Sequence, residues 1–450
     1  MPLERRSYAE EYHFKENDQR DRQRLRNRKT GPIRLNHQKR AKDKKVALIG
    51  WGIPSIEAMH RLKRPFVVVS LPEFEGYAEE HQIPFVSWDF GKDLPYEEVY
   101  KRSEELHALL KKLDVDHAVP IFEETVEWAG ALNSRFRKDA RLFDHSILFR
   151  DKAMMKRRAH VGGLRVGIFE EARNKEDVRN FFDRVNSAML RKQGDELEPI
   201  HVKALNKAGA SGHRMVISHE DIDSKLHDEN FPSLMESHLD GLEVSCEAFI
   251  HKGKVRFLNI TEYVVFGYSM MVPPTKEVEK YRPQIREEVQ KIVDIFDIEY
   301  GLIHPEFFIT DEGAVYFGEV AYRIPGGHIF DLMRKSYGFN PYEAHILCCD
   351  PNTTEEELKD IFPDETKNNG HAGSFLVYPK TNYISKVNIP GELEDHEYFD
   401  KHTLYKPAVP KIQSNQEGYG NHLGTIFFYG NDGEQVKQLL TDYVDHNFYI

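Results

Sequence analysis

The hydrophobic pattern from residue 45 onward predicts strands that alternate with helices. An apolar run at 46–49 leads into Gly50-Trp51-Gly52, residues 54–62 have the spacing of an amphipathic helix, and a second apolar run follows at 66–70. Short apolar runs separated by helical segments are typical of parallel strands joined by crossover helices. The paired glycines allow a close backbone approach, but without a third glycine they are weak evidence for a dinucleotide site.

The same order of elements continues toward residue 145. We expect an amphipathic helix at about 96–113, a strand at 117–122 and a helix that opens at Glu123 and runs to about residue 136. An open parallel sheet accommodates all of these elements with few assumptions. Residues 45–145 are therefore predicted to form an α/β domain.

Beyond residue 150, apolar runs paired around short turns predict antiparallel strands. Residues 233–250 form such a run before a turn at 251–254, and a helix is expected at 283–296. Near the end of the chain, apolar runs at 371–378 and 424–429 precede a helical pattern at 434–446. Residues 351–450 are thus predicted to form a small α+β cap.

Length and composition limit the classes of protein that fit. With 450 residues, 40% of them hydrophobic, the chain is long enough for two to four subdomains. No apolar run approaches the roughly 18 to 20 residues that span a bilayer, and the amino terminus lacks the apolar centre of a signal peptide. Three cysteines are too few for a disulfide framework, so we expect reduced thiols and a cytoplasmic protein without a membrane partner.

Charge separates residues 1–44 from the rest of the chain. Residues 1–45 hold 15 Lys and Arg against 7 Asp and Glu, a net charge of +8, which leaves −20 for the remainder of the total of −12. This basic arm suits nucleic acid, an acidic partner or an anionic membrane, or it is a tail that is solvated or packed on the acidic body. The last interpretation is favoured, and nucleic acid is not the expected partner.

The candidate chemistry is densest at residues 306–327. Glu306 begins an alternating apolar run, Asp311-Glu312-Gly313 supplies a turn, and the return strand carries Glu319, with Arg323 just beyond it. The hairpin brings Glu306 and Glu319 to one face. Two adjacent carboxylates repel each other unless a cation lies between them, and such oxygen ligands suit Mg²⁺. An ordinary exposed hairpin with two solvated glutamates is the alternative.

Two lysines and a glycine loop suit a phosphate. Lys152 follows Asp151 at a helix start, and Lys203 ends a short strand that leads into a loop containing Ser211 and Gly212. Backbone N–H groups of such a loop can cradle an anion, and lysines supply positive charge. The alternative for the loop is a plain hairpin turn.

Two further glutamates follow at a spacing of seven. Glu236 ends a strand whose backbone groups suit an adenine edge, and Glu243 is placed to accept hydrogen bonds from ribose hydroxyls. Each glutamate taken alone is more often a surface strand residue.

In this order, the segments resemble the ATP-grasp superfamily of ATP-dependent carboxylate ligases over about residues 46–349. The resemblance implies a fold of mixed α/β and α+β class: an open parallel sheet, then an ATP-grasp module at 146–350 with lobes of about 146–235 and 236–350, then the cap. It further implies site roles for nine residues. Lys152, Lys203, Ser211 and Gly212 would hold phosphates, Glu236 adenine, Glu243 ribose, Glu306 and Glu319 magnesium, and Arg323 an acyl phosphate or substrate carboxylate, with Lys203 and Arg323 catalytic.

One position departs from the family pattern. Many members carry Asn two residues after the second metal glutamate, where this chain has Ala321. The run Glu319-Val-Ala-Tyr-Arg323 looks more like the branch of amino-acid and dipeptide ligases, where a small residue also occurs. The number of magnesium ions is therefore left open, and Mn²⁺ is an alternative metal.

The resemblance implies an enzyme that uses ATP to join a carboxylate, an amino acid, to an amine through an acyl phosphate, with release of ADP and phosphate. Its partners would be small-molecule carboxylate and amine substrates. A ligase that loads a carrier protein, a carboxylase or kinase with the same ATP site, and a non-catalytic ATP-binding protein are the alternatives. A homodimer is left open.

Overall fold

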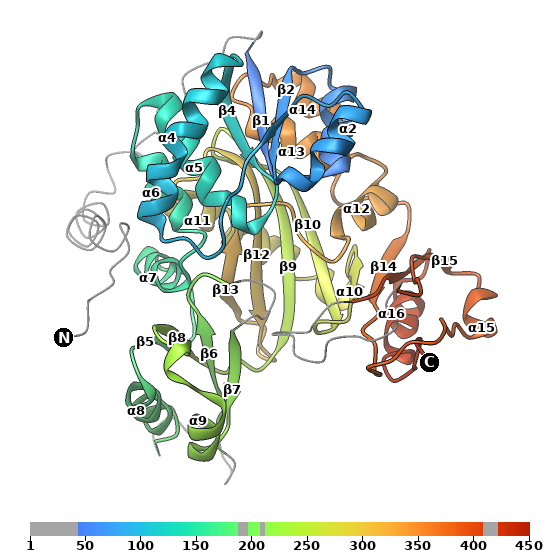
Figure 1. Cartoon of the computed structure of the whole chain (residues 1–450). Helices are drawn as coiled ribbons and strands as arrows, with labels where there is room; N and C mark the ends of the chain where they lie inside the picture. Colours follow the sequence, from blue (N-terminus) through green and yellow to red (C-terminus); the bar gives the residue numbers. More distant parts are fainter. Residues whose placement is uncertain (1–43, 188–196, 208–211, 408–421) are drawn as a thin grey trace.

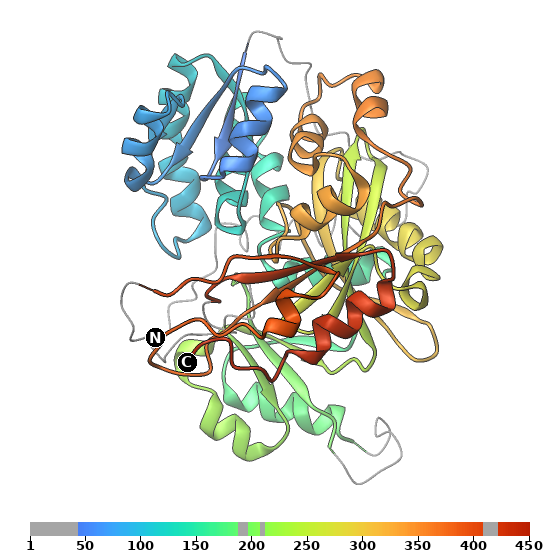
Figure 2. The same ribbon diagram turned by 90° about the vertical axis from the view of Figure 1, so that its right-hand side faces the viewer.

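Three β-sheets organise the protein in a computed structural model, which describes residues 44–187, 197–207, 212–407 and 422–450. In Figures 1 and 2 the amino-terminal sheet and a small antiparallel sheet lie at opposite ends of the molecule, with a large sheet between them. The basic arm at 1–43 lies outside the described residues, so its predicted role is untested.

The amino-terminal sheet is parallel, as its hydrophobic pattern predicts. Its strands are β1 (Lys45–Ile49), β2 (Phe66–Ser70), β3 (Phe85–Ser87) and β4 (Val115–Pro120), in the order β3-β2-β1-β4. Helices α2 (Ile53–Arg61), α3 (Glu75–Glu80), α4 (Tyr96–Lys112) and α5 (Val126–Arg137) connect or follow these strands. Because the strand order reverses direction between β1 and β4, the segments after these strands meet at one edge, where parallel sheets commonly bind ligands.

The small sheet has the order β5-β8-β6-β7 and is antiparallel. Its strands are β5 (Phe169–Ala172), β6 (Ile200–Ala204), β7 (His213–Val216) and β8 (Ser233–Ser237). Apolar side chains of α8 (Lys175–Val185) and α9 (His219–Lys225) pack on one face of it. The other face is left for polar side chains of β6, β7 and β8.

The large sheet has eight strands in the order β13-β12-β9-β10-β11-β14-β16-β15. They are β9 (Leu242–His251), β10 (Lys254–Val265), β11 (Ser269–Val272), β12 (Tyr300–Ile309), β13 (Val315–Ala321), β14 (His371–Leu376), β15 (Phe399–His402) and β16 (Thr425–Gly430). The strands of the predicted cap thus extend the large sheet. The short strand β15 was not predicted.

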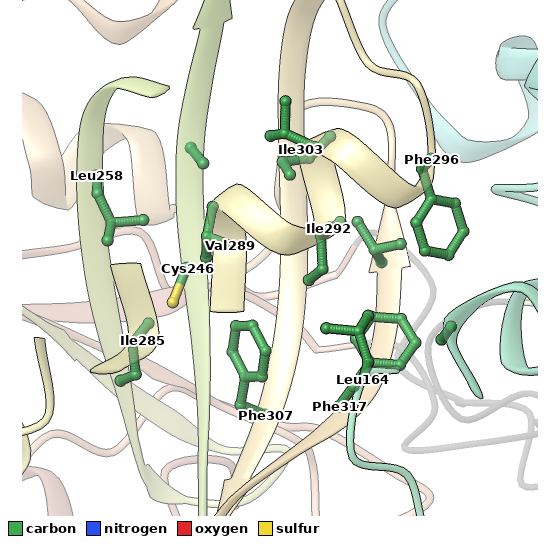
Figure 3. Packing of buried hydrophobic residues seen from close by; sticks show 14 of the residues in the cluster. Leu164, Cys246, Leu258, Ile285, Val289, Ile292, Phe296, Ile303, Phe307 and Phe317 are labelled. Atoms are coloured by element: carbon green, nitrogen blue, oxygen red, sulfur yellow. The ribbon is translucent and has the colours of Figure 1, made fainter. Parts of the chain in front are cut away.

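Alternation along the strands gives the large sheet one apolar face and one mixed face. Side chains of α11 (Arg282–Ile295), among them Ile285, Val289 and Ile292, pack against Cys246 and Phe307 (Figure 3). Successive strand residues point to opposite faces. Ser245 precedes Cys246 and Glu306 precedes Phe307, so both lie on the other face. That face therefore carries the candidate chemistry.

The remaining helices connect and cover the sheets. Helices α12 and α13 pack on the large sheet through a second apolar cluster, opposite α11. The bounds are α6 (Arg141–Ile147), α7 (Lys152–Gly162), α10 (Lys276–Glu279), α12 (Ile329–Tyr337), α13 (Pro341–Cys349), α14 (Glu355–Ile361), α15 (Gly391–Glu394) and α16 (Gly433–Asp442), with short 3₁₀ turns at Pro72–Phe74, Glu123–Thr125 and Asp228–Asn230.

The mixed α/β and α+β fold class is confirmed by these sheets. The three cysteines are buried, free thiols. Within the described ranges, no helix has the length and apolar content needed to cross a membrane. The predicted domain limits, the cytoplasmic location and the homodimer stay predictions.

Candidate functional site

Glu306 and Glu319 form the centre of the site. They are direct partners across the antiparallel pair β12–β13, as the predicted hairpin requires. The ladder then shifts register, because Phe307 pairs with Phe317 and leaves Gly318 as an extra residue in β13. A β-bulge of this kind reverses the face on which the following side chains lie. The bulge thereby turns Glu319 to the same face as Glu306 while Phe317 stays in the core.

Lys152 contacts this pair from a helix start. Asp151 caps α7 by accepting a hydrogen bond from the backbone N–H of Met154, which fixes the first turn. The Nζ of Lys152 lies 2.8 Å from Oε2 of Glu319. Burial opposes ionisation of Glu319, but Lys152 and Lys203 lower the pKa of this carboxyl to about 2. Glu319 is therefore an anion that already holds one cation.

A second charge cluster comes from the small sheet. The two oxygens of Glu236 on β8 lie 2.6 Å from Nζ of Lys156 and 2.8 Å from Nζ of Lys203. Burial would raise the pKa of Glu236, yet the two lysines hold it well below its usual range. Burial likewise opposes the charge on Lys203, and Glu236 and Glu319 raise its pKa above the ordinary value. Lys203 therefore stays positively charged while it faces the Glu306–Glu319 pair.

Glu243 lies beside the pair, on the same face of the large sheet. Its neighbour at two residues, Ser245, is the cross-strand partner of Glu306. Burial and the negative charge of Glu306 raise the pKa of Glu243 to about 8, against the opposing effect of Lys203. Three carboxylates thus crowd one face, and their mutual repulsion favours the neutral form of Glu243.

A buried polar network lies below Glu306. His304, two residues earlier on β12, places Nδ1 2.9 Å from Glu247 and Nε2 3.7 Å from Glu306. Glu247 is fully buried and accepts further hydrogen bonds from Asn259 and Thr261. Burial lowers the pKa of His304, but the two glutamates more than compensate and raise it to about 9. These residues were not predicted from the sequence; their only signal is their polar character in otherwise apolar strands.

Arg323 lies in a separate ion-pair chain that joins the segment after β13 to the segment after β4. Its Nε is 2.6 Å from Oε2 of Glu123, in the 3₁₀ turn after β4. Glu123 also receives a hydrogen bond from Arg150, which pairs in turn with Glu127. Burial opposes ionisation of Glu123, yet Arg323 and Arg150 lower its pKa, and Lys152 adds to the effect. Glu123, Glu127 and Arg150 were not predicted as site residues, because their link to the site is the Arg323–Glu123 contact, which joins segments 200 residues apart.

Three histidines form a hydrogen-bonded chain on the polar face of the small sheet. His201 contacts His213 at 2.8 Å with one ring nitrogen and His238 at 2.9 Å with the other, and His238 lies 3.2 Å from Asp240. Because burial and the nearby charge of Lys203 disfavour protonation, the pKa of His201 falls to about 3 and that of His213 to about 4. His201 lies on β6, two residues before Lys203, and His213 is the cross-strand partner of Lys203 on β7.

Most of the predicted site residues are brought together. Lys152, Lys203, Glu236, Glu243, Glu306 and Glu319 converge between the small and large sheets, and Arg323 reaches their edge through Glu123. Ser211 lies outside the described residues. Gly212 adopts a positive φ of +68°, and its carbonyl oxygen accepts a hydrogen bond from the backbone N–H of Ala204. The side chain of Ala321 is a methyl group, so it offers no ligand to a metal.

The carboxylate pair fits a magnesium ion that takes its other ligands from phosphate and water. Within the described part of the chain, no cluster of three or more His, Cys, Asp or Glu side chains is arranged as a complete metal site. Mg²⁺ commonly uses one or two protein carboxylates together with substrate phosphates. Glu306 and Glu319 supply such a set, with Lys152 and Lys203 beside them for the phosphates.

Comparisons with known proteins agree with this arrangement. Residues 201–331 match the model of the ATP-grasp domain family. The chain is 25% identical over 268 residues to an L-arginine-specific L-amino acid ligase of Bacillus subtilis, a match that covers 56% of this chain and 62% of that enzyme. The matched segment thus spans less than two thirds of the relative.

Solved structures resemble almost the whole fold. The L-amino acid ligase of Bacillus licheniformis superposes with a TM-score of 0.68 at 17% identity, covering 91% of this chain and 99% of that one. Phosphoribosylglycinamide synthetase of Anaerococcus prevotii gives a TM-score of 0.60 at 15% identity, covering 90% and 99%. At such identities the likeness concerns the fold. Residues 201–331 thus match an ATP-grasp domain, and most of the chain shares its fold with the L-amino acid ligase of Bacillus licheniformis.

Proposed function

We propose that the protein is an ATP-dependent ligase that joins the carboxylate of an amino acid to an amine. The observation that carries the proposal is the convergence of two facing carboxylates, Glu306 and Glu319, with two lysines from different elements, Lys152 and Lys203. This is the charge pattern needed to hold a magnesium nucleotide and stabilise phosphoryl transfer. Similarity to the L-amino acid ligases supports the choice of an amino acid.

In this proposal each residue has a distinct task. Glu306 and Glu319 would bind magnesium, which neutralises phosphate charge. Lys152 would move from Glu319 to a phosphate once the metal takes its place, and Lys203 would stay on Glu236 while it faces the transferred group. The strand that ends near Glu236 would offer its backbone groups to the base, and Glu243 would lie at the ribose. The metal and phosphate assignments rest on the side-chain contacts and charges described above, and those to the base and ribose rest on the family resemblance.

The second substrate site would lie at Arg323 and Glu123. A guanidinium recognises a carboxylate in a planar, two-pronged contact, and a carboxylate recognises an ammonium group. The two residues form an ion pair with each other, at 2.6 Å. An amino acid carries both complementary charges, so it can replace this internal pair without leaving either residue unpaired.

The chemistry would proceed in two steps. The substrate carboxylate attacks the γ-phosphate of ATP, which gives an acyl phosphate and ADP; the amine then attacks the acyl carbon, and phosphate leaves. Preorganised positive charge from Lys203 and Arg323 would stabilise the negative charge that develops in both steps. The chain would need no covalent nucleophile of its own.

The test is phosphate release from Mg·ATP with amino acids offered singly and in pairs, with mass detection of the products. A condensed product that requires a pair supports the proposal and identifies the substrates. Phosphate transferred to a single substrate, or carboxylation with bicarbonate, would instead favour a kinase or carboxylase. ATP binding without turnover across the panel would favour a carrier-protein acceptor or a non-catalytic protein. Glu319→Gln is the negative control, and Glu312→Gln, at an exposed position in the turn of the same hairpin, is the matched variant.

A further inference from the structure

Lys156 is a buried lysine that the proposed chemistry does not use. It lies on α7, one helical turn after Lys152, and only 4% of it is exposed. Burying an ammonium group costs several kcal/mol unless a partner compensates. Since burial of this charge is unfavourable and its partners are specific, Lys156 has a role other than core packing.

The contacts of Lys156 join two sheets. Its Nζ lies 2.6 Å from Oε1 of Glu236 on β8 of the small sheet and 3.2 Å from the carbonyl oxygen of Phe317 on β13 of the large sheet. Phe317 is the core residue that precedes the Gly318 bulge and Glu319. Lys156 therefore connects the strand that carries Glu319 to the strand that carries Glu236.

Glu236, which Lys156 holds in place, in turn holds Lys203. Its second oxygen lies 2.8 Å from Nζ of Lys203, whose side chain is 28% exposed toward the site, whereas that of Glu236 is 9% exposed. A carboxylate held at both oxygens has little rotational freedom, so it fixes the ammonium group that it holds. The path from β13 to Lys203 thus consists of two charge-assisted hydrogen bonds and the Phe317 contact.

From this geometry we infer that Lys156 is a positioning residue, which sets the place of Lys203 relative to the Glu306–Glu319 pair by holding Glu236 against β13. Lys156 itself touches no reacting group. The inference rests on the proposed function, because it assigns Lys203 to the phosphates of a nucleotide. Without Lys156, Glu236 keeps one lysine instead of two, and Lys203 is free to follow it away from the carboxylate pair.

The decisive measurement compares nucleotides that differ only in phosphate. In Lys156→Met, which keeps the length of the side chain but removes its charge, binding of Mg·ADP should weaken about 10-fold or more, the size of one lost charge-assisted contact. Binding of AMP, which lacks the β-phosphate, should weaken much less. Calorimetry or quenching of intrinsic fluorescence would give both dissociation constants without any turnover.

The matched control is Lys156→Arg, which keeps a charge at the same place and should restore at least part of the preference for Mg·ADP over AMP. Equal weakening of ADP and AMP in Lys156→Met would overturn the inference, since a general loss of structure weakens both. Dissociation constants for ADP and AMP that both stay at the wild-type values would overturn it as well. If Lys156→Met does not fold, Lys156→Gln is measured in its place and judged by the same ratio.

Failure of the nucleotide assignment, the part of the proposed function on which this inference rests, has a different signature. The wild-type protein would then bind neither ADP nor ATP, with or without magnesium. If instead the wild type binds Mg·ADP tightly and Lys156→Met shows the same preference for ADP over AMP, the nucleotide site is supported. Only the role of Lys156 is then refuted.

Discussion

Glu306 and Glu319 face each other across β12 and β13, although 13 positions separate them in the chain and a bulge interrupts the ladder beside them. A carboxylate pair with this geometry is stable only with cations near it. Lys152 supplies one such cation, with its Nζ 2.8 Å from Oε2 of Glu319. The pair therefore lies where positive charge is already provided by the chain.

Glu319→Gln should abolish magnesium-dependent turnover. The change keeps the volume of the side chain but removes one negative charge from the proposed metal site, so we expect a loss of about 10²-fold or more, comparable with the loss of a key electrostatic group. Phosphate release at saturating Mg·ATP measures it. Full activity in Glu319→Gln, at unchanged thermal stability, would refute the magnesium assignment.

Gly318→Ala should damage the site more than the fold. A Cβ at this bulge position would lie 2.9 Å from the carbonyl oxygen of Glu306. The strand must shift to relieve this contact, and the shift moves the two glutamates apart. We expect the affinity for Mg·ATP to fall about 10-fold, corresponding to about 1.4 kcal/mol.

The control for Gly318→Ala is Gly76→Ala, at a helical glycine with no atom within 4 Å of the added carbon. It should leave the affinity for Mg·ATP unchanged. Wild-type affinity in Gly318→Ala would mean that the bulge does not set the distance between the glutamates.

Arg323→Lys should reduce activity strongly while the charge is kept. Lysine cannot reproduce the planar, two-pronged contact that a guanidinium makes with a substrate carboxylate. We expect the KM of the amino-acid substrate to rise about 10-fold or more, while the KM of ATP changes little. Steady-state kinetics with each substrate varied in turn separates the two. Equal effects on both would argue against a substrate role for Arg323.

The sequence was sufficient for the fold class and for much of the site because both depend on local patterns. The hairpin with Glu306 and Glu319, the helix start at Lys152 and the strand that ends near Lys203 each follow from periodicity and turn residues within about twenty positions. The amino-terminal parallel sheet follows in the same way. Short, weakly apolar segments such as β15 carry too little pattern to be predicted.

The missed contacts are those between distant segments. Glu123 meets Arg323 across 200 residues, and Lys156 meets Glu236 across 80, so neither pairing has a local signature. The Gly318 bulge was missed for another reason. A hairpin with a turn of suitable length can place Glu306 and Glu319 on one face without any bulge. Only the observed pairing of Phe307 with Phe317 shows that β13 contains an extra residue, Gly318.

The histidine chain should make the protein less stable in acid. Burial and Lys203 hold the pKa of His201 at about 3 and that of His213 at about 4, below their ordinary value of 6.5. Between pH 6.5 and 4 the unfolded chain therefore binds protons that the folded chain does not. The stabilisation from these neutral rings is complete above pH 6.5 and is lost as the pH falls toward 4.

His201→Gln removes one of these groups, so the fall in melting temperature between pH 7 and pH 5 should be smaller than in the wild type. The difference should correspond to roughly 1 kcal/mol, since the rings are partly exposed to solvent. His227→Gln, at an exposed position of the same lobe, should behave like the wild type. Identical pH dependence in the wild type and His201→Gln would contradict the prediction.

Lys437→Met should destabilise the attachment of α16 to the large sheet. Glu262 on β10 is fully buried, accepts hydrogen bonds from the backbone N–H and hydroxyl of Thr275, and lies 2.6 Å from Nζ of Lys437. Removing one partner of a buried pair leaves an uncompensated charge, at a cost of about 3 kcal/mol; the partial exposure of Lys437 reduces this to about 2 kcal/mol. Urea unfolding would measure it. The double variant Glu262→Gln/Lys437→Met should be more stable than Lys437→Met alone, because it leaves no buried charge. If the two losses simply add, the pair is not coupled, and the stability of this junction comes from the apolar contacts of α16 instead.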